Sequence, residues 1–154
     1  MFKRFKKKKT EIYCPLNGEV LAIEAVSDPV FASKAMGDGF AVEPTDGRVY
    51  SPVAGKVTSI FPTKHAIGLM TEDGLEVLIH IGIDTVALNG EGFDILVNEG
   101  TVVAADTLLA KVDLEHLRNE QKPTTTMVIF TNLADQPLKI QTGTNAAQAV
   151  IGSL

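Results

Sequence analysis

The feature that most constrains this chain is a two-residue hydrophobic period that turns interrupt at short intervals. From Glu11 onward, apolar and polar residues alternate over a series of short segments: 18–24, 40–43, 48–51, 56–61, 65–70, 75–81, 108–113, 127–131 and 138–141. Turn formers such as Asp46-Gly47 and Asp73-Gly74 separate them. Many short strands at close spacing are typical of sandwiches and barrels. The sequence therefore predicts an all-β fold, an antiparallel β-sandwich or a barrel-like relative of one.

Two short helical turns interrupt the strand pattern. Residues 29–34 are expected to be helical because Asp28 suits the N-cap and Pro29 suits the first helical position. The second predicted turn covers residues 114–120, directly after Asp113. No linker composition is found beyond residue 10, so residues 11–154 are expected to form one domain.

The basic residues are concentrated at one end of the chain. Six of the 14 Lys and Arg residues lie in the first ten positions, which hold no acid, while the rest of the chain has 8 basic and 19 acidic residues. Because like charges repel, residues 1–10 are predicted to be a basic, flexible tail. Met1, Phe2 and Phe5 beside the lysines could give weak contact with an anionic membrane. The acidic body excludes a general nucleic-acid binder.

Several features indicate a cytoplasmic protein. No apolar run is long enough to span a bilayer, and no apolar segment follows the basic start as a secretory signal requires. Cys14 is the one cysteine, which excludes a disulfide within the chain and fits a reducing compartment.

Two of the three histidines can be placed against each other. The segment from His65 to His80 has the pattern of a hairpin around the turn formers of residues 71–74. A four-residue loop would place His65 directly opposite His80, with Cβ atoms about 5 Å apart. A two-residue loop would place Gly82 opposite His65 instead, so the pairing depends on the loop length.

An imidazole pair has more than one interpretation. Two half-buried histidines with hydrogen bonds need no function, and a zinc site needs a third and usually a fourth ligand. A neutral imidazole is nucleophilic at pH 7, and a second ring can stabilise a transferred charge, so the pair suits reversible phosphoryl transfer. Thr63 would project to the same face as His65 and could orient its ring. Asp84 lies near the end of the His80 strand, and His116 is predicted to be a solvated helix residue.

These segments resemble a known family. Residues 74–86, Gly-Leu-Glu-Val-Leu-Ile-His-Ile-Gly-Ile-Asp-Thr-Val, are similar over their whole length to the active-site signature of the enzyme IIA domain, glucose family, of the bacterial sugar phosphotransferase system. Other segments fit in order: 61–66 with the family's second histidine, then 30–32, 37–39 and 89–93. The likeness covers residues 12–152, and it implies the duplicated hybrid motif as the fold.

The resemblance implies a phosphotransferase that relays a phosphoryl group and requires no cofactor. The phosphocarrier HPr would donate the group to His80, and the IIB domain of a sugar permease would receive it. His65 would assist the onward transfer, with Thr63 orienting its ring. The His80 ring would be held through Nδ1 by the carbonyl of Gly82 or a neighbour, leaving Nε2 to react.

The resemblance also implies groups that surround the two histidines. Asp28 and Asp84 match acidic residues beside the site. Six residues match an apolar collar that would dock HPr and IIB in turn: Val30, Phe31, Met36, Phe61, Leu78 and Val86. Strand alternation places Leu78 on the same face as His80. The histidine pair could also hold zinc, and the charge of a bound phosphoryl group could change which regulatory targets bind.

Three other functions are compatible with parts of the sequence. Residues 52–57 resemble a strand motif of biotinyl and lipoyl carrier domains, but Lys34-Ala35-Met36 lacks the flanks of their modified lysine. His80 and Asp84 have the His-x-x-x-Asp spacing of some zinc peptidases, but no His-x-His element accompanies them. A regulatory binding module of the same fold without transfer would not need both histidines.

Overall fold

The computed structural model of the protein describes residues 10–154. The predicted basic tail lies outside the described residues, except for Thr10. The N–H and C=O groups of Thr10 both pair with Leu154, so the hydrogen-bonded fold includes one residue that the prediction assigned to the tail. No helix among residues 10–154 is long and apolar enough to cross a membrane.

Strands dominate the described chain, and they pair antiparallel into three sheets. The largest sheet has eight strands in this order: β13 (Gly143–Asn145), β2 (Gly18–Ala22), β3 (Asp38–Pro44), β11 (Thr126–Phe130), β7 (Glu76–Ile81), β6 (Ala66–Met70), β5 (Gly55–Ile60) and β9 (Val102–Val103). One small sheet has the order β4 (Arg48–Tyr50), β10 (Leu108–Val112), β8 (Phe93–Ile95). The other has the order β1 (Glu11–Tyr13), β14 (Val150–Ser153), β12 (Lys139–Ile140).

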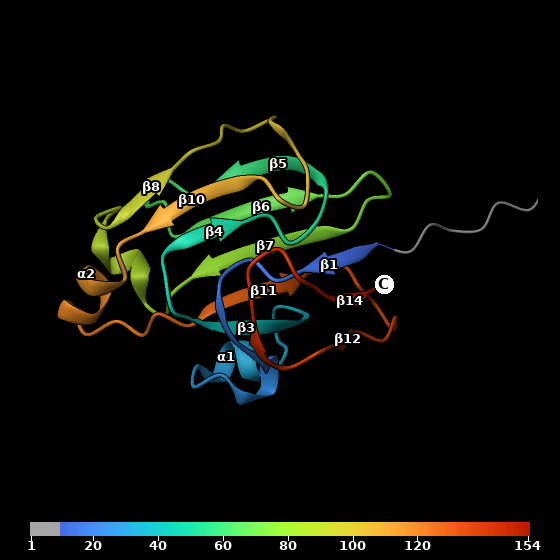
Figure 1. The fold of residues 1–154 in the computed structure, drawn as a ribbon, viewed down its shortest axis with the longest axis horizontal. Helices are drawn as coiled ribbons and strands as arrows, with labels where there is room; N and C mark the ends of the chain where they lie inside the picture. Colours follow the sequence, from blue (N-terminus) through green and yellow to red (C-terminus); the bar gives the residue numbers. More distant parts are fainter. Residues whose placement is uncertain (1–9) are drawn as a thin grey trace, which may run out of the picture.

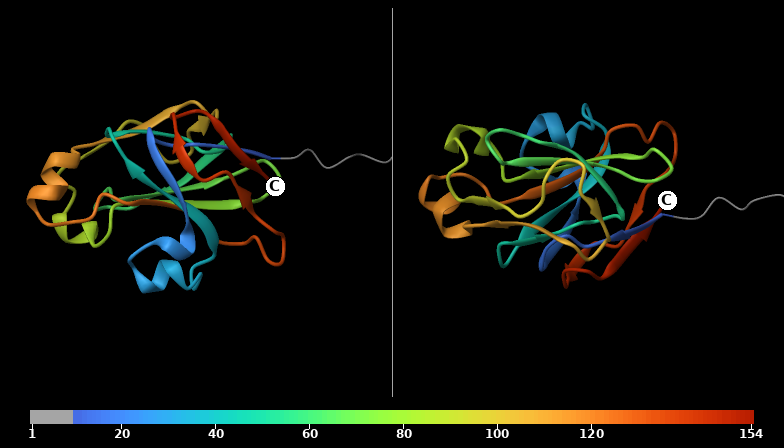
Figure 2. Two further views of the ribbon diagram at one scale, coloured as in Figure 1. Left: turned by 60° about the horizontal axis from the view of Figure 1, so that its bottom comes forward. Right: turned by 90° about the horizontal axis from the view of Figure 1, so that it is seen from above.

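The sheets form two layers, as predicted for a sandwich. The sheet of β4, β10 and β8 lies over the β5–β6–β7 part of the large sheet, and the sheet of β1, β14 and β12 lies toward the other end (Figures 1 and 2). The main hydrophobic core fills the space between the layers. The short strands β1, β8 and β9 are missed by the sequence prediction, because alternation is hard to recognise over two or three positions, whereas the equally short β4 and β12 lie within predicted segments.

The alternation of β7 decides where His80 lies. Val77, Ile79 and Ile81 are buried in the main core. Leu78 and His80 are half-buried and lie on the opposite face of the sheet, which confirms that they share a face. The active histidine predicted from the sequence is therefore on the outer side of the large sheet, away from the main core.

A second, smaller core covers that outer face. It collects residues from η1 (Ile23–Ala25), α1 (Pro29–Ala32), the large sheet and the segment after β7: Ile23, Val26, Phe31, Ala41, Ile83, Met127 and Ile129, with Leu21 and Leu78 packed against them. The Asp28 carboxylate caps α1 by accepting the N–H groups of Val30 and Phe31, as predicted. Helix α1 thus covers the face of β7 that carries His80.

Helix α2 (Leu114–Asn119) begins after Asp113, whose carboxylate accepts the N–H of His116. Its buried Leu114 and Leu117 belong to the main core. The helix lies at one end of the molecule beside η2 (Thr85–Leu88), as Figure 1 shows. It therefore borders the segment that leaves β7 after His80.

The register of the β6–β7 hairpin differs from the predicted one. Ala66, not His65, is the partner of His80. The loop has three residues, 72–74, and a hydrogen bond joins the residues on either side of it. Gly74 has a φ of 92°, the left-handed conformation that closes many three-residue hairpin loops. The four-residue loop inferred from the sequence is therefore wrong by one position.

Gly39 allows a test of how closely β3 and β11 approach. A Cβ atom at Gly39 would overlap the carbonyl oxygen of Val128, whereas a Cβ atom at Gly74 would meet nothing within 4 Å. We expect Gly39→Ala to lower the free energy of unfolding by about 3 kcal/mol, because backbone of the neighbouring strand must move. Gly74→Ala should cost about 1 kcal/mol, for its left-handed backbone alone. Equal losses in urea denaturation would contradict this packing.

Candidate active site

One hydrogen bond fixes the ring of His80 at the end of β7. Nδ1 of His80 lies 2.7 Å from the carbonyl oxygen of Gly82. A carbonyl oxygen can only accept a hydrogen bond, so Nδ1 carries the proton, and in a neutral ring Nε2 has a free lone pair. The structure places the Gly82 carbonyl where the resemblance implied, and the geometry prepares Nε2 to act as a nucleophile.

The turn after β7 directs the Gly82 carbonyl toward the ring. Gly82 has a φ of 77°, and an added Cβ atom would overlap the Thr85 side chain and lie 3.2 Å from Cδ2 of Leu117. The buried Thr85 hydroxyl donates to the carbonyl of Ile81 at 2.6 Å and so closes the turn. Thr85 is a supporting residue that the sequence prediction missed. The signal available in the sequence was a hydroxyl residue inside the signature of residues 74–86.

A left-handed turn positions His65 just before β6. Lys64 has a φ of 62°, and its N–H donates to the carbonyl of Phe61 at 2.7 Å. Because this turn precedes His65, strand alternation does not decide where its side chain points, and the ring reaches His80 despite the shifted register. Oγ1 of Thr63 lies 2.7 Å from Nδ1 of His65, the contact expected from the sequence.

The two imidazoles meet edge to face. Their centroids are 5.0 Å apart, with an angle of 76° between the ring planes. His65 is buried and His80 is half-buried. Since Nδ1 of each ring is bonded to a neighbouring group, the Nε2 atoms are the nitrogens left to contact a third group. The pair can therefore hold one transferred group between a nucleophile and a hydrogen-bond donor.

Two phenylalanine rings pack against the pair. The Phe31 centroid lies 5.0 Å from that of His80, and the Phe61 centroid lies 5.5 Å from that of His65. Phe31 is only 7% exposed, whereas Phe61 is 39% exposed. Phe31 therefore limits the rotation of His80 from below, and Phe61 forms part of the surface.

The six predicted collar residues fall into two groups. The members with large exposed side chains, 39–53% accessible, are Val30, Met36, Phe61 and Val86. Phe31 and Leu78 pack in the second core beneath the site. Phe31 belongs to α1, and Leu78 is half-buried on the sheet face that α1 covers, so both support the site from beneath. Their role as partner contacts stays a prediction. The exposed members are the ones that a partner can touch.

Burial lowers the pKa of both histidines. For His80 the loss of solvation is the main cause, and the nearby His65 adds to it, while the Gly82 carbonyl and the Asp28 and Asp84 carboxylates oppose it. For His65 burial alone lowers the pKa. Both rings are therefore neutral at pH 7, the form that leaves Nε2 of His80 nucleophilic.

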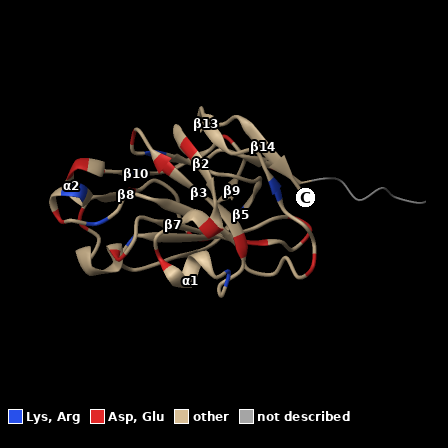
Figure 3. Cartoon of the chain, turned by 90° about the horizontal axis from the view of Figure 1, so that it is seen from below, with Lys and Arg blue, Asp and Glu red and all other residues tan. Residues whose placement is uncertain are grey.

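The described part of the chain carries more acidic than basic residues. Glutamate and aspartate outnumber lysine and arginine across the strands and turns in Figure 3. Asp28 at the start of α1 and Asp84 after β7 act electrostatically on His80, so both predicted acids lie beside the pair. A basic partner surface would be attracted to such a site.

The histidine pair offers two ligands to a metal ion, fewer than zinc usually takes from a protein. The group of three potential ligands found among residues 10–154 lies elsewhere, at Glu91, His116 and Glu120. Zinc between His65 and His80 would therefore need its remaining ligands from water or from another protein.

The lowered pKa values predict a measurable pH dependence. In an NMR titration, both active-site rings should protonate below about pH 6.5, the midpoint of an unperturbed histidine. Because the unfolded chain then binds more protons than the folded chain, the free energy of unfolding should fall as the pH drops below about 6.5. In His80→Gln the free energy of unfolding should fall less over the same pH range, because one of the two titrating rings is absent. Midpoints at or above 6.5 would contradict the buried, neutral pair.

The chain is similar to known proteins along most of its length. Residues 10–136 match the family described as phosphoenolpyruvate-dependent sugar phosphotransferase system, EIIA 1. The chain is 51% identical over 152 residues to the PTS system glucose-specific EIICBA component of Streptococcus pneumoniae serotype 4, covering 97% of this chain and 21% of that protein. It is 50% identical over 133 residues to the PTS system glucose-specific EIIA component of Staphylococcus aureus strain COL, covering 86% of this chain and 80% of that protein.

The fold has a solved counterpart. The glucose permease IIA from Mycoplasma capricolum has a TM-score of 0.91 and 35% sequence identity, covering 98% of this chain and 99% of that chain. The chain therefore spans nearly all of this structure and about a fifth of the length of the pneumococcal relative.

Proposed function

The chain belongs to the phosphoenolpyruvate-dependent sugar phosphotransferase system EIIA 1 family, and we propose that His80 is the residue that carries the phosphoryl group in its relay. The family membership confirms the resemblance found in the sequence and makes the protein a phosphotransferase component. The observation that carries the assignment to His80 is the hydrogen bond from Nδ1 to the Gly82 carbonyl, because it leaves Nε2 unprotonated and oriented.

In the first transfer, phospho-HPr is the donor. The lone pair on Nε2 of His80 attacks phosphorus, so that a new N–P bond forms while the bond to the donor breaks and its electron pair returns to HPr. The transition state is loose, so alignment and charge stabilisation dominate. The contacts of His80 with Gly82 and Phe31 hold the ring in place, so little ring motion is lost when Nε2 is aligned with phosphorus.

In the second transfer, His65 is the assisting group. We assign the Thr63 hydroxyl as the donor to Nδ1 of His65, which lies 2.7 Å away, so that the proton of that neutral ring sits on Nε2 and is donated to a phosphoryl oxygen on His80. A cysteine thiolate of the IIB domain then attacks phosphorus, the S–P bond forms, and the N–P electron pair returns to His80. Asp28 and Asp84 have the same sign of charge as the phosphoryl group and favour its departure.

The exposed collar residues are the proposed docking surface for HPr and IIB. The name of the pneumococcal relative, EIICBA component, supports a IIB domain as the recipient, and the glucose-specific names support a glucose permease as the destination. The relay is proposed to run in the cytoplasm without a cofactor or nucleic acid. Regulatory targets, zinc at the histidine pair and weak contact of residues 1–10 with an anionic membrane are further proposals that rest on the sequence.

Glutamine variants of the histidines separate the proposed roles. After incubation with phosphoenolpyruvate, enzyme I and HPr, His80→Gln should bind no acid-labile phosphate, because the nucleophile is absent. His65→Gln should still be phosphorylated but should pass the group to IIB about 100-fold more slowly, the usual cost of losing one charge-stabilising donor. His116→Gln is the matched control and should behave as the wild type in both assays.

The two roles would be reversed if His65→Gln accepted no phosphate while His80→Gln accepted it. Normal labelling of both variants would place the phosphoryl group elsewhere. Thermal melting of each variant shows whether a loss comes from unfolding.

A lysine at the collar tests the docking surface. Val86 is 53% exposed, and Val102 on β9, three strands from β7 in the sheet order, is 80% exposed. Val86→Lys should slow transfer from HPr and to IIB about tenfold, because a charge at the apolar contact must lose its water. Val102→Lys is the matched control and should leave both rates unchanged. Equal rates in the two variants would show that the partners dock elsewhere.

A further inference from the structure

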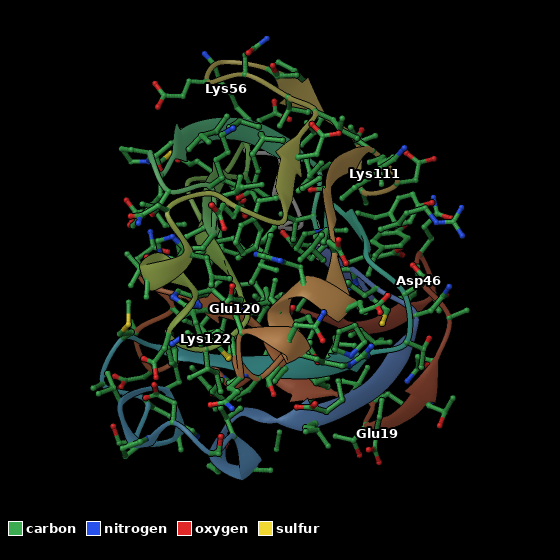
Figure 4. The ribbon with its side chains drawn as sticks, turned by 90° about the vertical axis from the view of Figure 1, so that its left-hand side faces the viewer. Glu19, Asp46, Lys56, Lys111, Glu120 and Lys122 are labelled. Carbon is green, nitrogen blue, oxygen red and sulfur yellow. The ribbon has the colours of Figure 1, made fainter. Side chains whose placement is uncertain are left out.

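A second group of ligand-bearing side chains lies at the end of the molecule formed by α2 and the turn before β8. One ligand atom each from Glu91, His116 and Glu120 lies within 4.8 Å of the others. His116 and Glu120 are one helical turn apart, so they project from the same face of α2. Figure 4 shows Glu120 beside this helix. The relay described above uses none of the three residues.

Nε2 of His116 is the unusual atom of this group. It is inaccessible to solvent and has no hydrogen-bond partner, although the His116 side chain as a whole is 28% exposed. The prediction that His116 is simply solvated is therefore wrong, because the ring turns inward against the turn before β8. An unpaired buried nitrogen costs free energy and calls for an explanation such as an ion or a water.

The distance from Nε2 of His116 to its nearest acid fits a shared metal ion. Oε2 of Glu91 lies 3.6 Å away, which is too long for a good hydrogen bond. Two ligands of a tetrahedral zinc ion, each bonded at about 2.0–2.1 Å, are about 3.4 Å apart. Small rotations of the exposed Glu91 and Glu120 side chains would bring all three ligands into range.

The frame around these ligands is already fixed. The His116 ring packs on Gly92, where an added Cβ atom would lie 2.9 Å from Cδ2 of the ring. The N–H of Asp113 donates to the Gly92 carbonyl at 2.8 Å, and the Asp113 carboxylate accepts the N–H of His116 at 3.0 Å. The turn that carries Glu91 is thus tied to the start of α2 before any ion binds.

We propose that Glu91, His116 and Glu120 form a binding site for a divalent transition-metal ion, with zinc as the best match. One imidazole nitrogen and two carboxylates are a donor set that zinc accepts, with water as the remaining ligand. Calcium and magnesium prefer sets made of oxygen alone. The two carboxylates also balance the charge of the ion.

The ion would clamp elements that border the phosphoryl-transfer site. Leu117 of α2 packs beside Gly82, whose carbonyl holds His80. Gly90, in the turn that carries Glu91, faces the Lys64 side chain: a Cβ atom added to Gly90 would lie 3.6 Å from Cδ of Lys64. The proposed ion is therefore structural, and its expected effect is on the stability of the fold.

Zinc titration of the metal-free protein tests the site. Calorimetry of the His80→Gln variant, which lacks the histidine pair, should show one zinc ion per chain, and zinc at 100 times its dissociation constant should raise the melting temperature by about 5 °C or more. Magnesium at the same concentration should give no shift. His116→Gln and Glu120→Gln should each weaken zinc binding at least tenfold. Glu115→Gln, an exposed neighbour on α2, is the matched control.

The histidine pair is the competing zinc site, and its variants distinguish the two. His65→Gln and His80→Gln should keep the zinc-induced shift. Loss of the shift in those variants, with retention in His116→Gln and Glu120→Gln, would overturn the proposal. Absence of any zinc-induced shift in the wild type would overturn it as well. Glu120 is exposed, so its variant tests the site even if His116→Gln proves unstable.

Discussion

The hydrogen bond from Nδ1 of His80 to the Gly82 carbonyl is the interaction on which the rest of the site depends. It sets the tautomer of the neutral ring and leaves Nε2, the atom that we propose to react, unprotonated. The carbonyl points at the ring because Gly82 has a left-handed backbone, which the buried Thr85 hydroxyl and the side chain of Leu117 enclose. A contact between residues two positions apart is therefore maintained by a helix that begins more than thirty residues later.

The large sheet makes a neutral nucleophile possible because both of its faces are covered. The alternation of β7 sends Ile79 and Ile81 into the main core and leaves His80 on the opposite face, where α1 brings Phe31 against it. Burial there lowers the pKa of His80, while the carboxylates of Asp28 and Asp84 raise it. The same carboxylates repel a dianionic phosphoryl group, so in the proposed relay they weaken the hold of His80 on that group after transfer.

Sequence reasoning predicts the features that depend on local rules. The face of His80 follows from alternation, and α1 follows from Asp28 as its cap. The hairpin register is missed by one residue because loop length is not readable from turn formers alone. The ring of His65 still reaches its partner through the left-handed Lys64, a conformation that lysine rarely adopts and that no pattern indicates. The inward ring of His116 depends on contacts with a distant turn, so its burial is likewise invisible in the sequence.

The most direct test is the nitrogen NMR spectrum of the protein, labelled with ¹⁵N in its histidines, before and after phosphorylation by HPr. The account predicts that in the free protein Nδ1 of His80 carries the proton and Nε2 carries none. In the phosphorylated protein, Nε2 of His80 should show one-bond coupling to phosphorus. Coupling of phosphorus to Nδ1 of His80, or to either nitrogen of His65, would contradict it.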